Sequence, residues 1–187
     1  MRLIDEPLPG IKLLEPDVFE DHRGFFLESY NRRRMANLGI DDDFVQDNHS
    51  RSGHMVLRGL HYQIHRPQAK LVRVTRGRVY DVVVDIRRGS PVFGKWAGVE
   101  LSDSNRHQLY APAGFAHAFL VLSDNAEFQY KCSDFYDAAD ERGLLWNDSD
   151  IGIDWPLGGV EPILSDRDRR WSTLSNVAVE DLPEYAP

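Results

Sequence analysis

The chain has 187 residues, of which 42% are hydrophobic and 28% are charged. This length supplies apolar side chains for one buried core and is short for two full domains. The net charge of −8 argues against general nucleic-acid binding, because affinity for a phosphate backbone needs a basic face. A small anionic ligand is compatible with this charge, since a few clustered basic side chains are enough to bind it.

Other features bear on the cellular compartment. The longest uncharged apolar runs, such as Val82-Val83-Val84, fall far below the roughly 20 residues that span a bilayer. Residues 1–6 lack the apolar stretch of a signal peptide. The single cysteine, Cys132, can form neither an intrachain disulfide nor a thiolate metal site, which suits a reducing compartment. We therefore expect a cytoplasmic protein without membrane contacts and with Cys132 in its core.

The N-terminal part predicts a few peripheral elements. Residues 11–19 indicate a short edge strand that contains a proline. Gly24 permits a turn or bulge, and the aromatic-rich run that follows it suits a strand. Asn31 is a candidate N-cap for a short helix over residues 32–38, which Gly39 ends.

From Phe44 onward the pattern is repeatedly that of β-strands separated by turn signals. The expected strands cover residues 45–49, 56–63, 70–76, 78–86, 96–101, 108–111, 116–121 and 126–132. Many short strands at even spacing indicate a sandwich or barrel. Within residues 78–86, strand alternation predicts that Tyr80, Val82, Val84 and Ile86 form the core face.

After Cys132 the chain becomes charged and rich in turns. We expect this last part to cover the end of a barrel, with Ser165 as the N-cap of a final helix and a loose tail at residues 180–187. The predicted organisation is one domain over residues 1–187. It divides into N-terminal edge strands at about 1–43, a barrel core at about 44–132 and a C-terminal covering segment at about 133–187.

One short run, Arg58-Gly59-Leu60-His61-Tyr62-Gln63, carries the strongest chemical signal. With nearby Lys70 it places ionisable groups among apolar residues, which is costly without a ligand that uses them. An imidazole with a pKa of about 6.5 is a natural base, a lysine can stabilise an enolate oxygen, and an inward-facing Tyr130 can return a proton. Each of these residues could instead be a satisfied core residue, although a buried lysine is the hardest to explain in that way.

A second signal is the turn Pro112-x-Gly114-x-x-His117, which leads a histidine from the rim towards the interior. This turn is similar to one in the cupin jelly rolls, where the histidine is commonly a metal ligand. The usual His-x-His pair is missing, because His61 and His65 lack that spacing, and a metal site needs three or four ligands. We therefore predict no metal site.

Six motifs occur in order between about Ile11 and Asp168. They are Asp21-x-Arg23-Gly24-x-Phe26-x-Glu28, Gln46-Asp47-Asn48, Arg58-Gly59-Leu60-His61-Tyr62-Gln63, Ala69-Lys70-Leu71-Val72, Pro112-x-Gly114-Phe115-Ala116-His117 and Leu164-Ser165-x-Arg167-Asp168. Together they resemble the dTDP-4-dehydrorhamnose 3,5-epimerase family. The resemblance implies an all-β, cupin-type jelly-roll β-sandwich or barrel with a few short helices. It weakens after Asp168, and Arg167 stands where the family usually has lysine, which binds oxygens with a different geometry.

The resemblance implies an isomerase of dTDP-L-rhamnose synthesis that epimerises dTDP-4-dehydro-6-deoxy-D-glucose at C3 and C5. Both carbons lie α to the C4 carbonyl, so their hydrogens can leave as protons once the enolate is stabilised. His61 is implied as the general base, oriented by Asp168. Lys70 would stabilise the oxyanion at C4, and Tyr130 would return a proton to the opposite ring face. This reaction needs no redox cofactor, and none is predicted.

Binding roles are implied in the same way. Arg23 and Arg58 would bind the diphosphate, with assistance from Arg167. The other implied substrate contacts are Phe26, Glu28, Gln46, Asp47, Asn48, Lys70, His117 and Glu141. In an ideal strand Arg58 and His61 face opposite sides, so we expect either a bulge at Gly59 that reconciles them or an approach of Arg58 from a neighbouring surface.

The expected partner is the dTDP-linked 4-keto-6-deoxyhexose substrate, and the resemblance implies a homodimer in which the N-terminal edge strand is available for exchange. One alternative is a relative that epimerises a single centre, C3 or C5, of a dTDP-4-keto-deoxysugar for antibiotic synthesis. The sequence does not separate the two, because they share catalytic residues. A non-catalytic nucleotide-sugar-binding cupin and a metal-dependent cupin enzyme are less favoured, since a mere binder has no use for a poised base.

Overall fold

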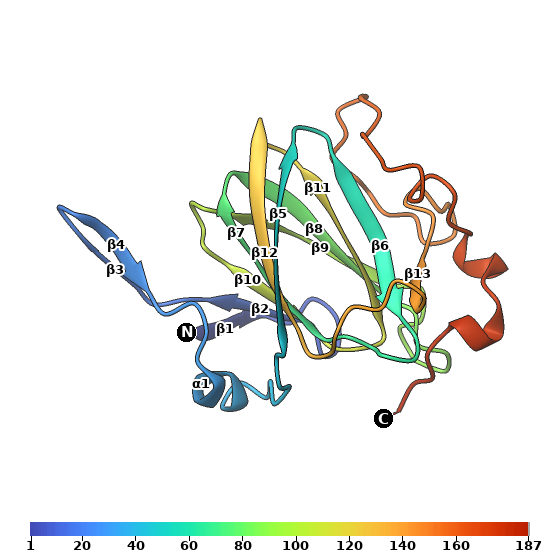
Figure 1. The fold of residues 1–187 in the computed structure, drawn as a ribbon, viewed down its shortest axis with the longest axis horizontal. Coiled ribbons are helices and arrows are strands. Elements are labelled where there is room, and N and C mark those ends of the chain that lie inside the picture. Colours follow the sequence, from blue (N-terminus) through green and yellow to red (C-terminus); the bar gives the residue numbers. More distant parts are fainter. Residues whose placement is uncertain (187) are drawn as a thin grey trace.

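Two antiparallel β-sheets pack against each other, and a short hairpin projects from one side (Figure 1). The computed structural model describes residues 1–186. In spatial order, the six-stranded sheet contains β1 (Arg2–Asp5), β2 (Lys12–Glu15), β10 (Gln108–Ala111), β7 (Lys70–Arg76), β12 (Asn125–Cys132) and β5 (Gln46–Gly53). The five-stranded sheet contains β13 (Glu141–Gly143), β6 (Leu57–Gln63), β11 (Phe115–Val121), β8 (Arg78–Asp85) and β9 (Trp96–Ser102). This arrangement confirms the predicted all-β sandwich.

Helical structure is short. It consists of α1 (Arg32–Ala36) and two 3₁₀ turns, η1 (Leu174–Asn176) and η2 (Val179–Asp181). The expected cap is present, because the Asn31 side chain accepts a hydrogen bond of 3.2 Å from the backbone N–H of Arg34. Nowhere in residues 1–186 does a helix combine the length and the apolar character needed to cross a membrane.

All eight strands expected between residues 44 and 132 are present, with ends that differ by up to a few residues. The largest difference is at β5, which runs through the turn expected at Ser52-Gly53. Its partner β12 continues to Asn125, opposite Gly53, and so extends the ladder. Period-two alternation therefore located the strands well, while tertiary pairing set their ends.

The single edge strand expected at residues 11–19 is incorrect. Two strands, β2 and β3 (Val18–Asp21), occupy this stretch, and β2 lies inside the six-stranded sheet, between β1 and β10. The sheet ends instead at β1, a strand that the sequence did not predict. All four residues of β1 are exposed, so this strand shows no alternation that a pattern could detect.

The sequence predicted one buried face for β8, but both faces of this strand are buried. Val79 and Val83, on the other face, are fully buried between the two sheets. Val82 and Val84 are fully buried on the outer side of the five-stranded sheet. A strand covered on both sides carries apolar residues at successive positions, as the run Val82-Val83-Val84 does.

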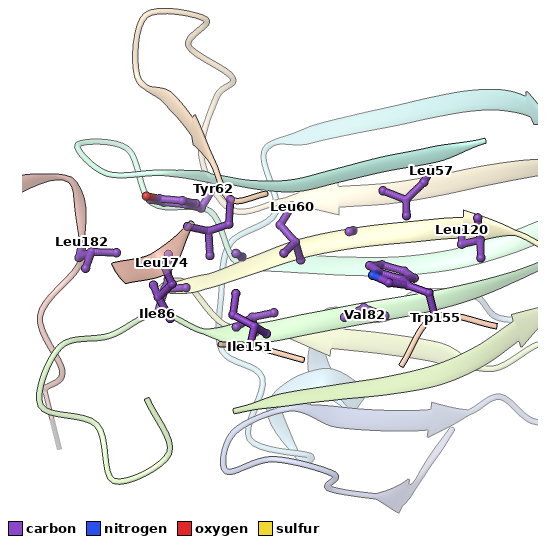
Figure 2. Packing of buried hydrophobic residues seen from close by; sticks show 14 of the residues in the cluster. Leu57, Leu60, Tyr62, Val82, Ile86, Leu120, Ile151, Trp155, Leu174 and Leu182 are labelled. Atoms are coloured by element: carbon purple, nitrogen blue, oxygen red, sulfur yellow. The ribbon is translucent and has the colours of Figure 1, made fainter. Parts of the chain in front are cut away.

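We expected the C-terminal segment to cover the end of the barrel. It covers the outer face of the five-stranded sheet instead. Figure 2 shows Trp155 beside the sheet residue Val82 and, towards the other end of the same cluster, Leu174 beside Ile86. The segment thus forms a third layer, and a second hydrophobic core lies between it and the five-stranded sheet. This layer is what buries the second face of β8.

Two further expectations for the C-terminal segment are wrong. No helix begins at Ser165, although its hydroxyl accepts a hydrogen bond of 3.1 Å from the Asp168 backbone N–H within a turn. The tail from residue 180 is attached rather than loose, since Leu182 is buried and the Arg88 N–H donates to the Pro183 carbonyl at 2.8 Å. The last residue of the expected loose tail, Pro187, lies outside the described residues.

The projecting hairpin is formed by β3 and β4 (Gly24–Leu27), and its two faces differ (Figure 1). On one face the Arg106 guanidinium lies 4.4 Å above the Phe25 ring and pairs with Glu20 at 2.8 Å. On the other face Phe19 and Phe26 are 66% and 69% exposed. The hairpin is therefore held by one face and presents two aromatic rings on the other.

Candidate active site

A cavity of about 580 Å³ is lined by side chains from both sheets and from the C-terminal segment. The six-stranded sheet contributes β5, β7 and β12, and the five-stranded sheet contributes β6, β11 and β13. Residues 163–165, 167 and 168 of the C-terminal segment complete the wall. This volume is typical of a site for a small organic ligand.

A histidine–aspartate pair lies in the cavity wall. His61 Nε2 on β6 is 2.6 Å from Asp168 Oδ1, and Asp168 is only 3% exposed. Burial alone would raise the pKa of Asp168, but the hydrogen bond and charge of His61, with smaller contributions from Ser165 and Trp171, outweigh it, and the pKa is lowered. The carboxylate therefore stays ionised and engages Nε2, which leaves the Nδ1 lone pair of a neutral His61 free to accept a proton.

Lys70 on β7 and Tyr130 on β12 line the same cavity. Desolvation lowers the pKa of Lys70, against the opposing effect of nearby Cys132. Burial raises the pKa of Tyr130 to about 12. At neutral pH Tyr130 thus keeps a proton that it can donate, and Lys70 gives up its proton more readily than an exposed lysine.

His117 on β11 is held by a buried carboxylate. Its Nε2 lies 2.9 Å from Asp81 Oδ1, and Asp81 is fully buried. Burial raises the pKa of Asp81, while His117 acts in the opposite direction. Among residues 1–186, no group of three or more His, Cys, Asp and Glu side chains has an arrangement that could hold a metal ion. The structure instead makes His117 a fixed part of the cavity wall, with its ring stacked 6.0 Å from Phe128.

Arg58 and His61 both line the cavity, although ideal alternation would separate them. The register of β6 against β11 shifts between these residues, since His117 is opposite His61 and Phe119 is opposite Arg58. Gly59 lies at this shift with φ of +112°, and a Cβ there would be 2.4 Å from the His117 carbonyl oxygen. Only glycine fits, so the irregularity expected at Gly59 is present and brings both side chains to one site.

Ten of the fourteen residues predicted for the site surround this cavity: Gln46, Asn48, Arg58, His61, Lys70, His117, Tyr130, Glu141, Arg167 and Asp168. The side chains of Glu141 and Arg167 form an ion pair, and His61 Nδ1 is 3.7 Å from Glu141 Oε1. The cavity thus combines a proton-accepting imidazole, the phenol of Tyr130 and three cationic side chains. Such a set can remove a proton next to a carbonyl and bind an anionic ligand.

The other four predicted residues do not line the cavity of their own chain. Arg23 is at the tip of the hairpin, where it pairs with Asp21, and Phe26 is on the exposed hairpin face. Glu28 pairs with Arg34 at 3.2 Å. Asp47 binds Lys131 at 2.8 Å on the opposite face of β5 from Gln46 and Asn48. Alternation along β5 requires this separation.

Sequence reasoning gave no role to several polar residues of the cavity wall, among them Gln63, Gln68 and Tyr136. The Tyr136 ring is half exposed, and its hydroxyl donates to Glu141 Oε2 at 3.0 Å. A usable signal was present, because Phe135-Tyr136 is an aromatic pair in a charged loop directly after the strand that carries Tyr130. Adjacent exposed aromatic residues form an apolar patch, and such patches often mark a contact with a ligand or a partner.

Known proteins resemble this chain over most of its length. A family model described as dTDP-4-dehydrorhamnose 3,5-epimerase matches residues 5–176. A dTDP-4-dehydrorhamnose 3,5-epimerase from Pseudomonas aeruginosa is 56% identical over 170 residues, which cover 90% of this chain and 93% of that relative.

Solved structures agree with these sequence matches. The crystal structure of dTDP-6-deoxy-D-glucose-3,5-epimerase from Legionella pneumophila, in complex with dTDP-4-keto-L-rhamnose, has a TM-score of 0.97 and 48% identity, covering 100% of this chain and 99% of that chain. A 3′-monoepimerase from Streptomyces bikiniensis, in complex with dTDP-quinovose, has a TM-score of 0.89 and 37% identity, covering 97% and 93%. The same fold therefore serves enzymes that act on one or on two sugar carbons.

Proposed function

The chain belongs to the dTDP-4-dehydrorhamnose 3,5-epimerase family, and we propose that its cavity performs the family's reaction through His61, Lys70 and Tyr130. The enzyme epimerises dTDP-4-dehydro-6-deoxy-D-glucose at C3 and C5 to dTDP-4-dehydro-L-rhamnose. The observation that supports the assignment of residues is the His61–Asp168 pair, which shares one cavity with a lysine of lowered pKa and a protonated tyrosine.

Proton removal is assigned to His61. Its Nδ1 would take the hydrogen of C3 or C5 as a proton, while Asp168 holds Nε2 at 2.6 Å and stabilises the imidazolium that forms. The electron pair of the broken C–H bond moves into the ring and places negative charge on the C4 oxygen. General acid–base catalysis of this kind contributes about 10² to 10⁴ to a rate.

Lys70 and Tyr130 complete the step. The Lys70 ammonium would stabilise the charge on the C4 oxygen, and this interaction is stronger in a cavity than in water. Tyr130 and His61 line the cavity from different sheets, Tyr130 from β12 of the six-stranded sheet and His61 from β6 of the five-stranded sheet. A proton delivered from Tyr130 would reach the opposite face of the ring carbon. One proton leaves one face and another arrives at the other, so the configuration is inverted without any redox change.

Binding of the diphosphate is assigned to Arg58 and Arg167, two cationic side chains of the cavity wall in a protein of net charge −8. Arginine suits this role because its guanidinium donates two parallel hydrogen bonds to phosphate oxygens. We assign further contacts to Gln46, Asn48 and His117. Local positive charge, rather than overall charge, would attract the substrate.

We also propose that the enzyme is a homodimer in which the hairpin of one copy reaches the cavity of the other. Arg23, Phe26 and Glu28 lie away from their own cavity, and the Phe19 and Phe26 rings are exposed on the free hairpin face. Strand β5, which lines the cavity, is at the edge of its sheet, where a further strand can add. In this arrangement Arg23 and Phe26 of a second copy would contact the nucleotide diphosphate.

Two coarser properties complete the proposal. We infer that residues 1–187 function as one jelly-roll epimerase domain, because the N-terminal strands, the barrel core and the C-terminal layer all pack on the same two sheets. We place the enzyme in the cytoplasm, since its one cysteine is a free, buried thiol that suits a reducing compartment.

Incubation with the 4-keto-6-deoxyglucose nucleotide in heavy water tests this function. Mass spectrometry should show that the wild-type enzyme introduces one solvent deuteron at C3 and one at C5. The His61→Ala variant should bind dTDP like the wild type and incorporate neither deuteron. Full exchange by His61→Ala would remove the base assignment, and incorporation at only one carbon by the wild type would identify a single-centre epimerase.

A further inference from the structure

The segment from Asp134 to Asp137 connects β12 to β13 and contains Tyr136 of the cavity wall. It forms neither a helix nor a strand, so its conformation depends on the groups that bind its backbone. Each of its four residues has a backbone group hydrogen-bonded to a glutamine side chain. The three glutamines come from different parts of the chain and all line the cavity.

The hydrogen bonds follow the segment residue by residue. Gln68 Nε2 donates to the Asp134 carbonyl at 2.8 Å, and Gln63 Nε2 donates to the Phe135 carbonyl at 3.2 Å. Gln46 Oε1 then accepts from the Tyr136 N–H at 2.9 Å. Gln63 Oε1 accepts from the Asp137 N–H, also at 2.9 Å.

Gln63 is the central member of this set. It is only 6% exposed, and its amide also donates to the Arg66 carbonyl at 2.7 Å. The side chain thus uses its oxygen and its nitrogen to join the segment to the loop after β6. A buried amide is costly unless such partners satisfy it, so its position is well determined.

The consequence for the cavity is the position of Tyr136. Its ring forms part of the wall, and its hydroxyl donates to Glu141 Oε2 at 3.0 Å. Glu141 in turn pairs with Arg167 and lies near His61. Movement of the segment would therefore displace the wall and disturb the Glu141–Arg167 pair together.

We propose that Gln46, Gln63 and Gln68 are positioning residues, which hold the segment from Asp134 to Asp137 so that Tyr136 forms a fixed wall of the substrate site. This inference rests on the proposed function, which makes the cavity a site for a dTDP-linked sugar. Within residues 1–186, no hydrogen bond joins these glutamines to His61, Lys70 or Tyr130. The three glutamines therefore act on binding rather than on proton transfer.

Substitution by methionine tests this role, because methionine is similar in length and uncharged and cannot replace the amide hydrogen bonds. Gln63→Met should raise KM for the substrate and Kd for dTDP about tenfold, with kcat within about twofold of the wild type. Gln68→Met, which loses a single hydrogen bond, should raise both by about threefold. Asn176→Met is the matched control, since its amide ties a turn outside the cavity through a 2.8 Å hydrogen bond to Thr173.

A double-mutant cycle separates positioning from general structural damage. In a Tyr136→Ala background, Gln63→Met should change Kd for dTDP by less than about twofold, because the group it positions is gone. An equal effect in both backgrounds, or a fall in kcat with unchanged KM, would overturn the proposal. If Gln63→Met does not fold, the same cycle with Gln68→Met decides the question.

Calorimetric titration measures Kd for dTDP directly, so the result of the double-mutant cycle does not depend on catalysis. A wild-type protein that binds dTDP but does not epimerise the sugar would contradict the proposed function and leave the cycle interpretable. Unchanged dTDP affinity in both glutamine variants, with an active enzyme, would contradict only the positioning role.

Discussion

At the scale of single residues, the burial of Lys70 affects catalysis because it makes the catalytic ammonium easier to deprotonate. Desolvation lowers the pKa of Lys70 because the cavity favours the neutral amine. Burial raises the pKa of Tyr130 to about 12. An alkaline loss of activity that occurs below the pKa of Tyr130 therefore belongs to Lys70.

The resulting prediction concerns the pH dependence of kcat. The rate should fall as pH rises through a value below the usual lysine pKa of 10.5, because the ammonium that stabilises the enolate is lost. In Lys70→Arg the residual activity should lack this alkaline fall, since a guanidinium keeps its proton. A pH profile of kcat for both proteins checks this, and the same fall in Lys70→Arg would contradict it.

The free energy of unfolding should depend on the same proton, but in the opposite direction: kcat falls as pH rises, whereas the contribution of Lys70 to stability increases. Between the lowered folded-state pKa and the unfolded value, the unfolded chain binds more protons at Lys70, so this residue's contribution to the free energy of unfolding rises with pH. Lys70→Met removes the contribution. Urea unfolding of both proteins at neutral and alkaline pH measures the difference, and a decrease with pH would be inconsistent with the lowered pKa.

At the scale of elements, the C-terminal segment acts as a structural layer as well as the source of Asp168. It covers the outer face of the five-stranded sheet, and Trp155 is one of its anchors. This side chain is 8% exposed, and its indole N–H donates to the Trp146 carbonyl at 2.8 Å. Packing of this layer therefore supports the strand that carries His61 and the turn that carries Asp168.

Trp155→Ala should lower the free energy of unfolding by about 3 to 5 kcal/mol, because it removes a large buried ring and leaves a cavity. Val179→Ala is the control, since Val179 is 60% exposed and such surface changes usually stay within about 0.5 kcal/mol. Chemical denaturation measures both. A small effect of Trp155→Ala would show that the C-terminal layer adds little to the folded core.

At the scale of the whole molecule, the proposed exchange of hairpins makes two chains depend on each other. His61 acts in its own cavity, whereas Arg23 would act in the cavity of the second copy. Two inactive variants can then complement each other. In a mixed dimer of His61→Ala and Arg23→Ala chains, one site has both defects and the other has neither.

Co-expression of these two variants should recover about a quarter of wild-type activity, because about half of randomly paired dimers are mixed and each has one intact site of two. Each variant expressed alone gives the baseline. Light scattering on the purified sample gives the oligomeric state. A dimer without recovered activity would show that Arg23 does not act across the interface, and a monomer would exclude the exchange itself.

The sequence by itself determined the fold class, the strands from β5 to β12 and ten of the residues around the cavity. These properties are local, because alternation records which side chains are buried and motifs such as Arg58-Gly59-Leu60-His61-Tyr62-Gln63 keep chemical groups at short, definite spacing. Even the conflict between Arg58 and His61 was resolved by one local feature, the glycine at position 59.

Only the tertiary structure decided the properties that depend on distant parts of the chain. Both faces of β8 are buried because the C-terminal segment folds back over the sheet. The family resemblance implied that Asp168 orients His61, but only the structure shows the 2.6 Å contact between these residues, which are 107 positions apart. The position of the hairpin that carries Arg23 and the contacts of the glutamines around Tyr136 likewise depend on distant parts of the chain. Contacts between remote segments leave no periodic signal in the sequence, so neither the direction of the hairpin nor the partners of Gln63 could be read from it.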